Sequence, residues 1–108
     1  MIRVEEYLLP GEALAIPARE LCSLAGLENS RSLRAAIDRE RMAGALILAT
    51  DRGYFLPASD PVQARSELRA FLRRQDARLV SNRRSVKAVR RALRELDRAA
   101  AGQLELGE

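Results

Sequence analysis

Residues 16–57, IPARELCSLAGLENSRSLRAAIDRERMAGALILATDRGYFLP, decide the fold of this chain. The first part of the stretch predicts a helix of roughly ten residues, because Leu21, Leu24 and Ala25 follow one another at helical spacing and form one apolar stripe. Gly26 then marks the C-terminus of this helix, since glycine readily adopts the left-handed conformation that ends many helices.

A second helix is predicted from about residue 31 to residue 43. Asn29 or Ser30 can cap its N-terminus, because either side chain can accept a hydrogen bond from a backbone N–H that lacks a partner. Leu33 and Ile37 are spaced to lie on the inward face of this helix. The stretch therefore reads as a helix, a short turn and a second helix.

Glu40 lies on the same stripe as Leu33 and Ile37, where an apolar side chain is expected. A buried carboxylate at this position needs an arginine partner or titrates, because burial disfavours an unpaired charge. We therefore expect Glu40 to be the irregular point of the second helix.

The hydrophobic period changes after residue 44. Two β-prone runs, residues 46–48 and residues 54–56, are separated by Thr50-Asp51-Arg52-Gly53. Because Asp and Gly are typical residues of hairpin turns, this segment predicts a short β-hairpin.

Four motifs in this order resemble those of bacterial winged helix-turn-helix domains. They are Ala18-Arg19-Glu20-Leu21, Gly26-Leu27, Leu33-Arg34-Ala35-Ala36-Ile37 and Gly53-Tyr54-Phe55-Leu56-Pro57. The resemblance covers about residues 4–58 and is greatest to small phage and prophage proteins. It implies a mostly α (α+β) fold, a winged helix-turn-helix with a short β-hairpin wing. It also implies a DNA-binding protein, a dimeric transcriptional regulator of the phage or prophage type.

If the second helix reads double-stranded DNA, its N-terminal half faces the bases, where arginine can pair bidentately with guanine. Arg41 and the wing residue Arg52 are then expected to contact phosphate or the minor groove. The alternative is that these arginines only solvate an outer face and that the domain contacts protein. The candidate DNA-binding residues are Arg31, Ser32, Arg34, Ala35, Asp38, Arg39, Arg41 and Arg52.

The composition of the 108-residue chain excludes several kinds of chemistry. No histidine is present and Cys22 is the single cysteine. Histidine-based acid–base catalysis, the common zinc clusters and an internal disulfide are therefore excluded. Cys22 lies beside an apolar stripe, which predicts a buried structural thiol. Without a phosphate-binding loop or dinucleotide motif, we expect a protein that is not an enzyme and has no cofactor or metal.

No stretch approaches the roughly 18 apolar residues of a membrane span, and no basic-then-apolar signal segment opens the chain. We therefore expect a cytoplasmic protein without a membrane partner. The expected domains are a winged helix-turn-helix domain at residues 1–58, a long basic helix for dimerisation at residues 59–101 and a flexible tail at residues 102–108.

The positive charge is concentrated in the second half of the chain. Residues 1–60 contain seven arginines against nine acidic residues, a net charge of −2, whereas residues 61–108 contain twelve basic residues against six acidic ones, a net charge of +6. DNA affinity depends heavily on neutralising phosphates. The first domain alone would therefore bind DNA weakly.

Residues 60–100 are predicted to be helical almost throughout. Asp60 can cap this helix, Pro61 can take its first position and Gln63 completes a capping-box-like arrangement. A 3-4 repeat of apolar residues predicts a coiled-coil seam along the helix. The candidate dimerisation residues are Leu68, Leu72, Leu79, Val86, Val89, Leu93 and Leu96.

Three questions about this helix stay open from the sequence. Polar residues in the centre of the seam, Gln75 and Asn82, can set the register of a dimer, or the helix can break into a hairpin at residues 81–82. The flanking charges disfavour a parallel homodimer and admit an antiparallel one centred near Arg83, with Arg69 opposite Asp97 and Asp76 opposite Arg90 of the second copy. The basic outer surface is either a solvated face or a nucleic-acid contact.

Two other functions remain alternatives to the regulator. One is a replication or packaging accessory protein that binds DNA with little sequence preference. The other is a protein–protein adaptor with a winged-helix fold that binds no DNA.

Overall fold

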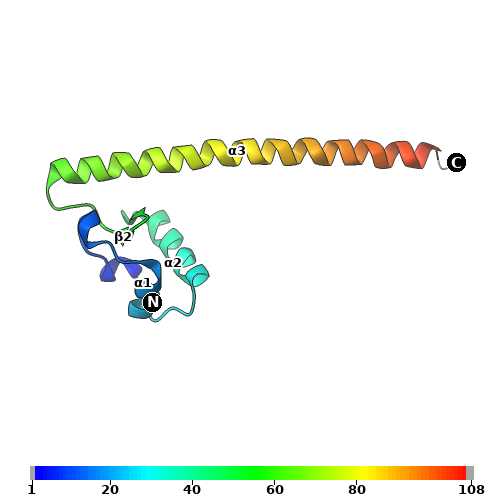
Figure 1. Ribbon diagram of the computed structural model, residues 1–108. Helices are drawn as coiled ribbons and strands as arrows, with labels where there is room; N and C mark the ends of the chain where they lie inside the picture. The colour runs from blue at the N-terminus through cyan, green and yellow to red at the C-terminus, as the bar shows by residue number, and fades with distance from the viewer. Residues whose placement is uncertain (1, 107–108) are drawn as a thin grey trace. The chain divides into compact units, whose positions relative to one another are not determined.

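The computed structural model describes residues 2–106. The chain divides into two compact units, Met1–Leu72 (unit 1) and Arg73–Glu108 (unit 2). Its elements are the 3-10 helices η1 (Val4–Tyr7) and η2 (Glu12–Leu14), helices α1 (Ala18–Ala25) and α2 (Ser30–Met42), strands β1 (Leu48–Thr50) and β2 (Gly53–Phe55), and helix α3 (Pro61–Leu106) (Figure 1). The fold is therefore mostly helical with one two-stranded antiparallel sheet, which confirms the expected α+β class.

The core of unit 1 lies where α1, α2 and η1 meet. Leu33 and Ile37 of α2 are buried, as predicted, and pack with Leu21 of α1 and Val4 of η1. The prediction for Leu24 was wrong, because half of this side chain is exposed. Helix α1 has only eight residues and buries a single stripe, Leu21 and Ala25, so Leu24 lies outside the contact.

The turn between α1 and α2 is fixed at both ends. Gly26 adopts the left-handed conformation with φ of 70°, and the N–H of Leu27 donates to the Cys22 carbonyl at 2.9 Å. At the start of α2, the Asn29 side chain accepts a hydrogen bond from the backbone N–H of Ser32 at 2.9 Å. Both the helix end at Gly26 and a cap by Asn29 are confirmed. The Cys22 thiol is only half-buried and donates to the Asn29 carbonyl at 3.5 Å.

The strands of the β-hairpin are as short as the β-prone runs suggested but lie closer to the turn, at residues 48–50 and 53–55. It pairs Leu48 with Phe55 and Thr50 with Gly53, leaving a two-residue turn. The pairing begins with Leu48 and Phe55; the next residues outward bond elsewhere, the Ile47 carbonyl to Arg41 and the Leu56 backbone to Leu9 and Gly11.

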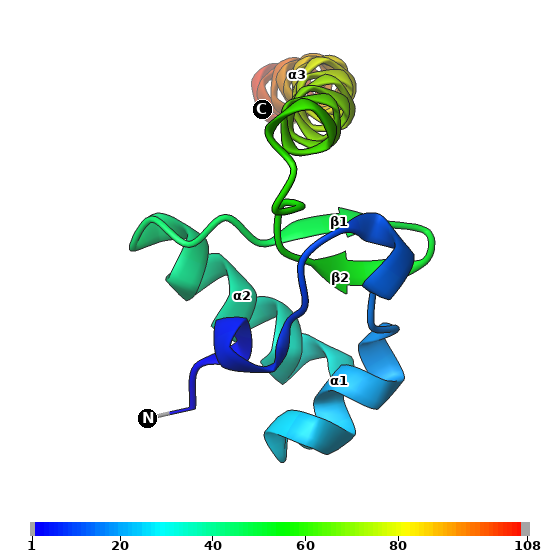
Figure 2. The same cartoon turned by 90° about the vertical axis from the view of Figure 1, so that its left-hand side faces the viewer.

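A third segment runs along the free edge of β2, a contact that was not predicted from the sequence. The backbones of Ile16 and Tyr54 exchange two hydrogen bonds of 2.9 Å, and the N–H of Gly11 donates to the Leu56 carbonyl at 2.8 Å. A side chain at Gly53 would overlap the Ile16 carbonyl, and φ of +133° at this residue also favours glycine. The close approach joins the hairpin to the start of α1. Helices α1 and α2 lie on one side of the hairpin (Figure 2).

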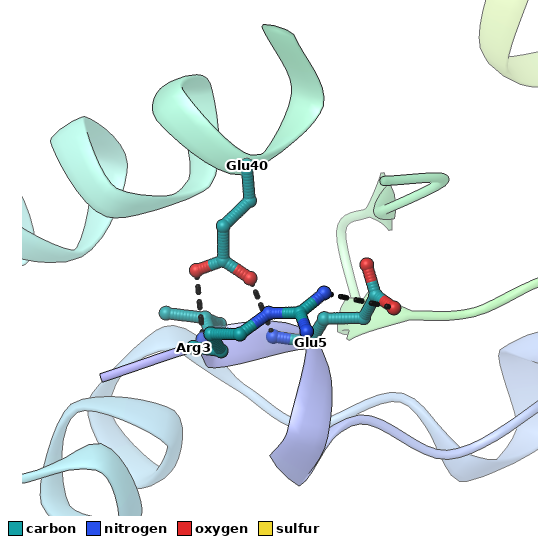
Figure 3. A network of polar contacts seen from close by, with 4 residues as sticks. Arg3, Glu5 and Glu40 are labelled. Carbon is teal, nitrogen blue, oxygen red and sulfur yellow. Dashed lines mark hydrogen bonds and ion pairs between the residues drawn. The ribbon is translucent and has the colours of Figure 1, made fainter. Parts of the chain in front are cut away.

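Glu40 is only half-buried, and its carboxylate is paired with backbone rather than with an arginine, which was one of the two alternatives expected for a buried carboxylate. Its carboxylate accepts hydrogen bonds from the N–H groups of Val4 at 2.7 Å and Glu5 at 2.9 Å (Figure 3). These N–H groups lie in the first turn of η1, where a helix leaves donors without partners. Arg3 lies beside this group but pairs with Glu5, at 3.8 Å. Glu40 therefore fastens the N-terminal segment to α2.

Helix α3 is continuous from Pro61 to Leu106, so residues 81–82 do not form a hairpin. The cap is confirmed, since the Asp60 carboxylate accepts from the N–H of Gln63 at 3.0 Å. The side chain of Gln63 does not close a capping box but donates to Glu67 at 3.5 Å. The tail expected at residues 102–108 lies partly on α3 and partly, at residues 107–108, outside the described residues.

A second carboxylate, Glu67, holds the first turns of α3 in unit 1. One oxygen accepts from the N–H of Ala58 and the other from the N–H of Glu12, both at 2.8 Å. Two glutamates of unit 1, Glu40 and Glu67, thus each accept hydrogen bonds from two backbone N–H groups and hold separate segments together. None of the helices in residues 2–106 combines the length and the apolar character needed to cross a membrane.

Candidate nucleic-acid interface

Helix α2 has one face in the core and one in solvent. Leu33, Ala36 and Ile37 are buried against the rest of unit 1. Because the Asn29 cap fixes the beginning of the helix and Glu40 is bonded to η1 near its end, the orientation of the exposed face is set by packing and by polar contacts together.

The exposed face carries most of the predicted DNA-binding residues. Arg31, Arg34, Ala35 and Asp38 are exposed and occupy positions i, i+3, i+4 and i+7, so they share one side of the helix. Arg39 is exposed at the edge of this group. We call these five residues the α2 face.

Ser32 is only half-buried and sits outside the centre of that face. Its backbone N–H is already bonded to the Asn29 side chain. Its hydroxyl therefore lies at the junction of the turn and the helix, next to the α2 face rather than within it.

Arg41 is placed differently from the other arginines. Its Nε donates to the Ile47 carbonyl at 2.9 Å, and its guanidinium carbon lies 5.0 Å from the centre of the Phe71 ring. An arginine over an aromatic face is attracted by the ring quadrupole. The half-buried Arg41 therefore fastens the end of α2 to the approach to β1 and to the first turns of α3. The sequence does not indicate this role, because Phe71 lies 30 positions further along the chain.

The hairpin presents Arg52 at its turn. This side chain is exposed, and the backbone N–H of Arg52 donates to the Thr50 hydroxyl at 3.2 Å. The following Tyr54 is partly buried against the core, so its ring supports the hairpin. Arg52 is thus a separate basic point on unit 1, carried by a different element from the α2 face.

The chemistry of the α2 face combines donors with one acceptor. Arginine presents a planar fork of N–H donors, whereas the Asp38 carboxylate only accepts hydrogen bonds. The carboxylates of Glu40 and Glu67 accept hydrogen bonds from backbone N–H groups within the fold, so they are not part of the α2 face. The α2 face itself therefore carries three arginines against one carboxylate.

The predicted dimerisation residues lie along α3 and are apolar side chains in contact with water. In unit 2, Val86 is 48% exposed and Leu96 is 68% exposed, and the others fall between these values. Leu68 and Leu72, in unit 1, line an apolar hollow of about 440 Å³ together with Phe71 and Leu46. The predicted dimerisation residues in unit 2 are Leu79, Val86, Val89, Leu93 and Leu96.

The rest of the α3 surface in unit 2 is strongly basic. Residues 73–102 contain ten basic residues against three acidic ones, a net charge of +7, and nearly all of the basic side chains are exposed. Arg84, Arg91 and Arg98 follow at intervals of seven, so they form a line on the side of the helix away from the seam.

In the part of the chain that the structure describes, no three histidine, cysteine, aspartate or glutamate side chains group to hold a metal ion.

Comparison with models of protein families, with curated proteins and with solved structures finds no match for this chain.

Proposed function

We propose that this chain is a DNA-binding protein in which α1 and α2 form the helix-turn-helix, the hairpin is the wing and α3 joins two copies. The observation that carries the proposal is the α2 face. A recognition helix must be held rigidly on one side and present hydrogen-bonding side chains on the other, and α2 meets both requirements.

The α2 face has the functional groups for direct readout of base edges. Arg31 and Arg34 can each pair bidentately with guanine, and Asp38 can accept from the amino group of cytosine. Ala35 is small enough to leave room for a thymine methyl group. Arg39 and Arg52 supply positive charge for phosphates, which position a protein on DNA without reading sequence.

The charge distribution favours action as a dimer. Unit 1, residues 1–72, contains nine basic residues against ten acidic ones, a net charge of −1, so one copy of unit 1 gains little from counterion release. Two copies joined through α3 double the number of base contacts and add the basic surface of the helix. A sequence-specific transcriptional regulator, the role implied by the resemblance to small phage and prophage winged-helix proteins, is the function that this combination supports best.

The test begins with selection of bound sites from a random duplex library by the purified protein. Fluorescence anisotropy then compares the selected site with a scrambled one at two salt concentrations. We expect Arg34→Ala to lose about 1–3 kcal/mol of preference for the selected base. Arg34→Lys keeps the charge but lacks the bidentate fork, so it should retain scrambled-site binding and lose the preference.

The matched control is Arg65→Ala, which removes one exposed arginine from the first turns of α3. It should leave the ratio of selected to scrambled affinity unchanged. Selection that yields no enriched sequence, or an Arg34→Ala variant with the full wild-type ratio, would refute readout by the α2 face.

The basic surface of α3 supports a second candidate, an accessory protein that binds DNA without sequence preference. In that case Arg84→Ala, Arg91→Ala and Arg94→Ala together weaken binding to every sequence. Each lost phosphate contact also flattens the slope of log affinity against log salt by about 0.9. If the protein binds no DNA even at low salt, both DNA-binding candidates are refuted. The adaptor alternative then remains.

A further inference from the structure

Unit 2 exposes an apolar stripe that nothing within the unit covers. The described part of unit 2 consists of α3 alone, and the seam residues Leu79, Val86, Val89, Leu93 and Leu96 are each about half to two-thirds exposed. A single helix gains most of its stability by packing an apolar face against another element. The stripe runs along an unbroken helix, so its partner must be elongated as well.

We propose that the stripe is covered by the same stripe of a second copy, running antiparallel, with the two-fold axis between residues 82 and 86. This inference rests on the dimer in the proposed function and adds its direction and register. The residues on the two flanks of the stripe, and the charges among them, indicate that the partner is a second copy of the chain.

The two flanks of the stripe differ in character. One flank has mostly small residues, Ser85, Ala92 and Ala99, with one arginine, Arg78, and the other has the charged residues Asp76, Arg83, Arg90 and Asp97. In an antiparallel pair each flank meets the same flank of the second copy, so Ser85 faces Ser85, Ala92 faces Arg78, and the charged flanks face each other. In a parallel pair opposite flanks meet, which places Arg78 against Arg83 and leaves the acidic residues opposite uncharged ones.

The charged flank also selects one register. With the axis between residues 82 and 86, Asp76 faces Arg90 and Asp97 faces Arg69 of the second copy, and each contact occurs twice by symmetry. On this charged flank, only Arg83 meets its own copy.

Neighbouring registers, one heptad away in either direction, pair charges less well. One sets Asp76 against Asp97 and Arg83 against Arg90. The other sets Arg69 against Arg90 and keeps one kind of attractive pair, Asp76 with Arg83. Since like charges in contact are unfavourable, the central register is preferred over both.

In the proposed register the interior layers are mostly apolar, and one layer sets Gln75 against Leu93 of the second copy. Leu72 faces Leu96 and Leu79 faces Val89 of the second copy. Next to the axis Asn82 faces Val86, and the two Asn82 amides fall in adjacent layers, where they can hydrogen bond to each other. A buried asparagine of this kind fixes register in coiled coils.

Cysteine cross-linking tests both direction and register on the full-length chain without DNA, in a Cys22→Ser background. A mixture of Leu79→Cys and Val89→Cys chains should form a disulfide-linked dimer on oxidation, at least tenfold above either variant alone. A disulfide needs Cα atoms within about 7 Å, and in this register the two copies of residue 79 are about 15 Å apart along the helix.

A second variant is placed outside the seam, because a cysteine within the seam can weaken the packing of the dimer. Ser85→Cys, on an exposed flank position, should link to its own copy, because residue 85 lies next to the axis on the flank of small residues. Sedimentation of the unmodified chain should give twice the 12.0 kDa of one copy.

Three results would overturn the inference. They are a monomer in sedimentation, self-linking of Leu79→Cys as a parallel pair requires, or a dimer in which neither the mixture nor Ser85→Cys cross-links. Failure of base readout by Arg34 variants leaves all of these cross-links unchanged, so the two proposals can fail separately.

Discussion

Replacing Glu40 should destabilise unit 1 far more than its half-exposed position suggests. The carboxylate accepts two hydrogen bonds, 2.7 Å from the Val4 nitrogen and 2.9 Å from the Glu5 nitrogen. Hydrogen bonds to a charged group contribute about 1.5–3 kcal/mol each, with the lower end suited to a partly solvated pair. Since Val4 is fully buried, its N–H cannot be rehydrated without opening η1. We therefore expect Glu40→Ala to lower the free energy of unfolding by about 2–4 kcal/mol.

Glu40→Gln should lose roughly half as much, about 1–2 kcal/mol, because the amide keeps one acceptor oxygen but turns an NH₂ group toward the second donor. The matched control is Asp38→Ala, an exposed acidic residue two positions earlier on the same helix. The free energy of unfolding of the Asp38→Ala variant should stay within about 0.5 kcal/mol of the wild-type value.

The assay is urea unfolding at a fixed chain concentration, followed by tyrosine fluorescence. Both tyrosines, Tyr7 and Tyr54, lie in unit 1 and the chain has no tryptophan, so this signal reports unit 1, whereas circular dichroism is dominated by the long α3. Hydrogen exchange at the Val4 amide gives a second reading. Wild-type stability of Glu40→Ala, together with unchanged protection of the Val4 amide, would refute the assigned role.

Three further substitutions test the local structure by the same tyrosine-monitored unfolding. Gly53→Ala should cost more than about 2 kcal/mol, because its φ of +133° is strained for alanine and the added Cβ would overlap the Ile16 carbonyl; near-wild-type stability would contradict the close approach of these segments. Asn29→Ala should cost about 0.5–2 kcal/mol through loss of the α2 cap, and Asn29→Ser should recover most of it. Leu33→Ala should cost about 2–5 kcal/mol through a cavity in the core, and a smaller effect would mean that α2 shifts to fill the space.

The parts of the fold that could be predicted from sequence are those encoded by neighbouring residues. Gly26 ends α1, Asn29 caps α2, and Leu33 and Ile37 face inward, because each depends on spacing within one or two turns. The cap of α3 by Asp60 is of the same kind. These features needed no knowledge of the rest of the chain.

The features that were missed depend on residues far apart in sequence. Glu40 is bonded to backbone 35 and 36 positions earlier, and a backbone N–H leaves no mark in the sequence. Arg41 looked like its neighbours on α2, yet it lies over Phe71. The contact between Ile16 and Tyr54 of β2 is likewise made by main-chain groups, so no side-chain pattern predicts it.

Arg41 gives α2 a mechanical link to the helix that follows. Its side chain holds the Ile47 carbonyl and the Phe71 ring at once, so the last turn of α2 rests on a residue at the beginning of α3. If association of α3 restrains Phe71, this contact offers a path to the end of α2. Any coupling of this kind is reciprocal, so a ligand that restrains α2 would then act on Phe71 to the same degree.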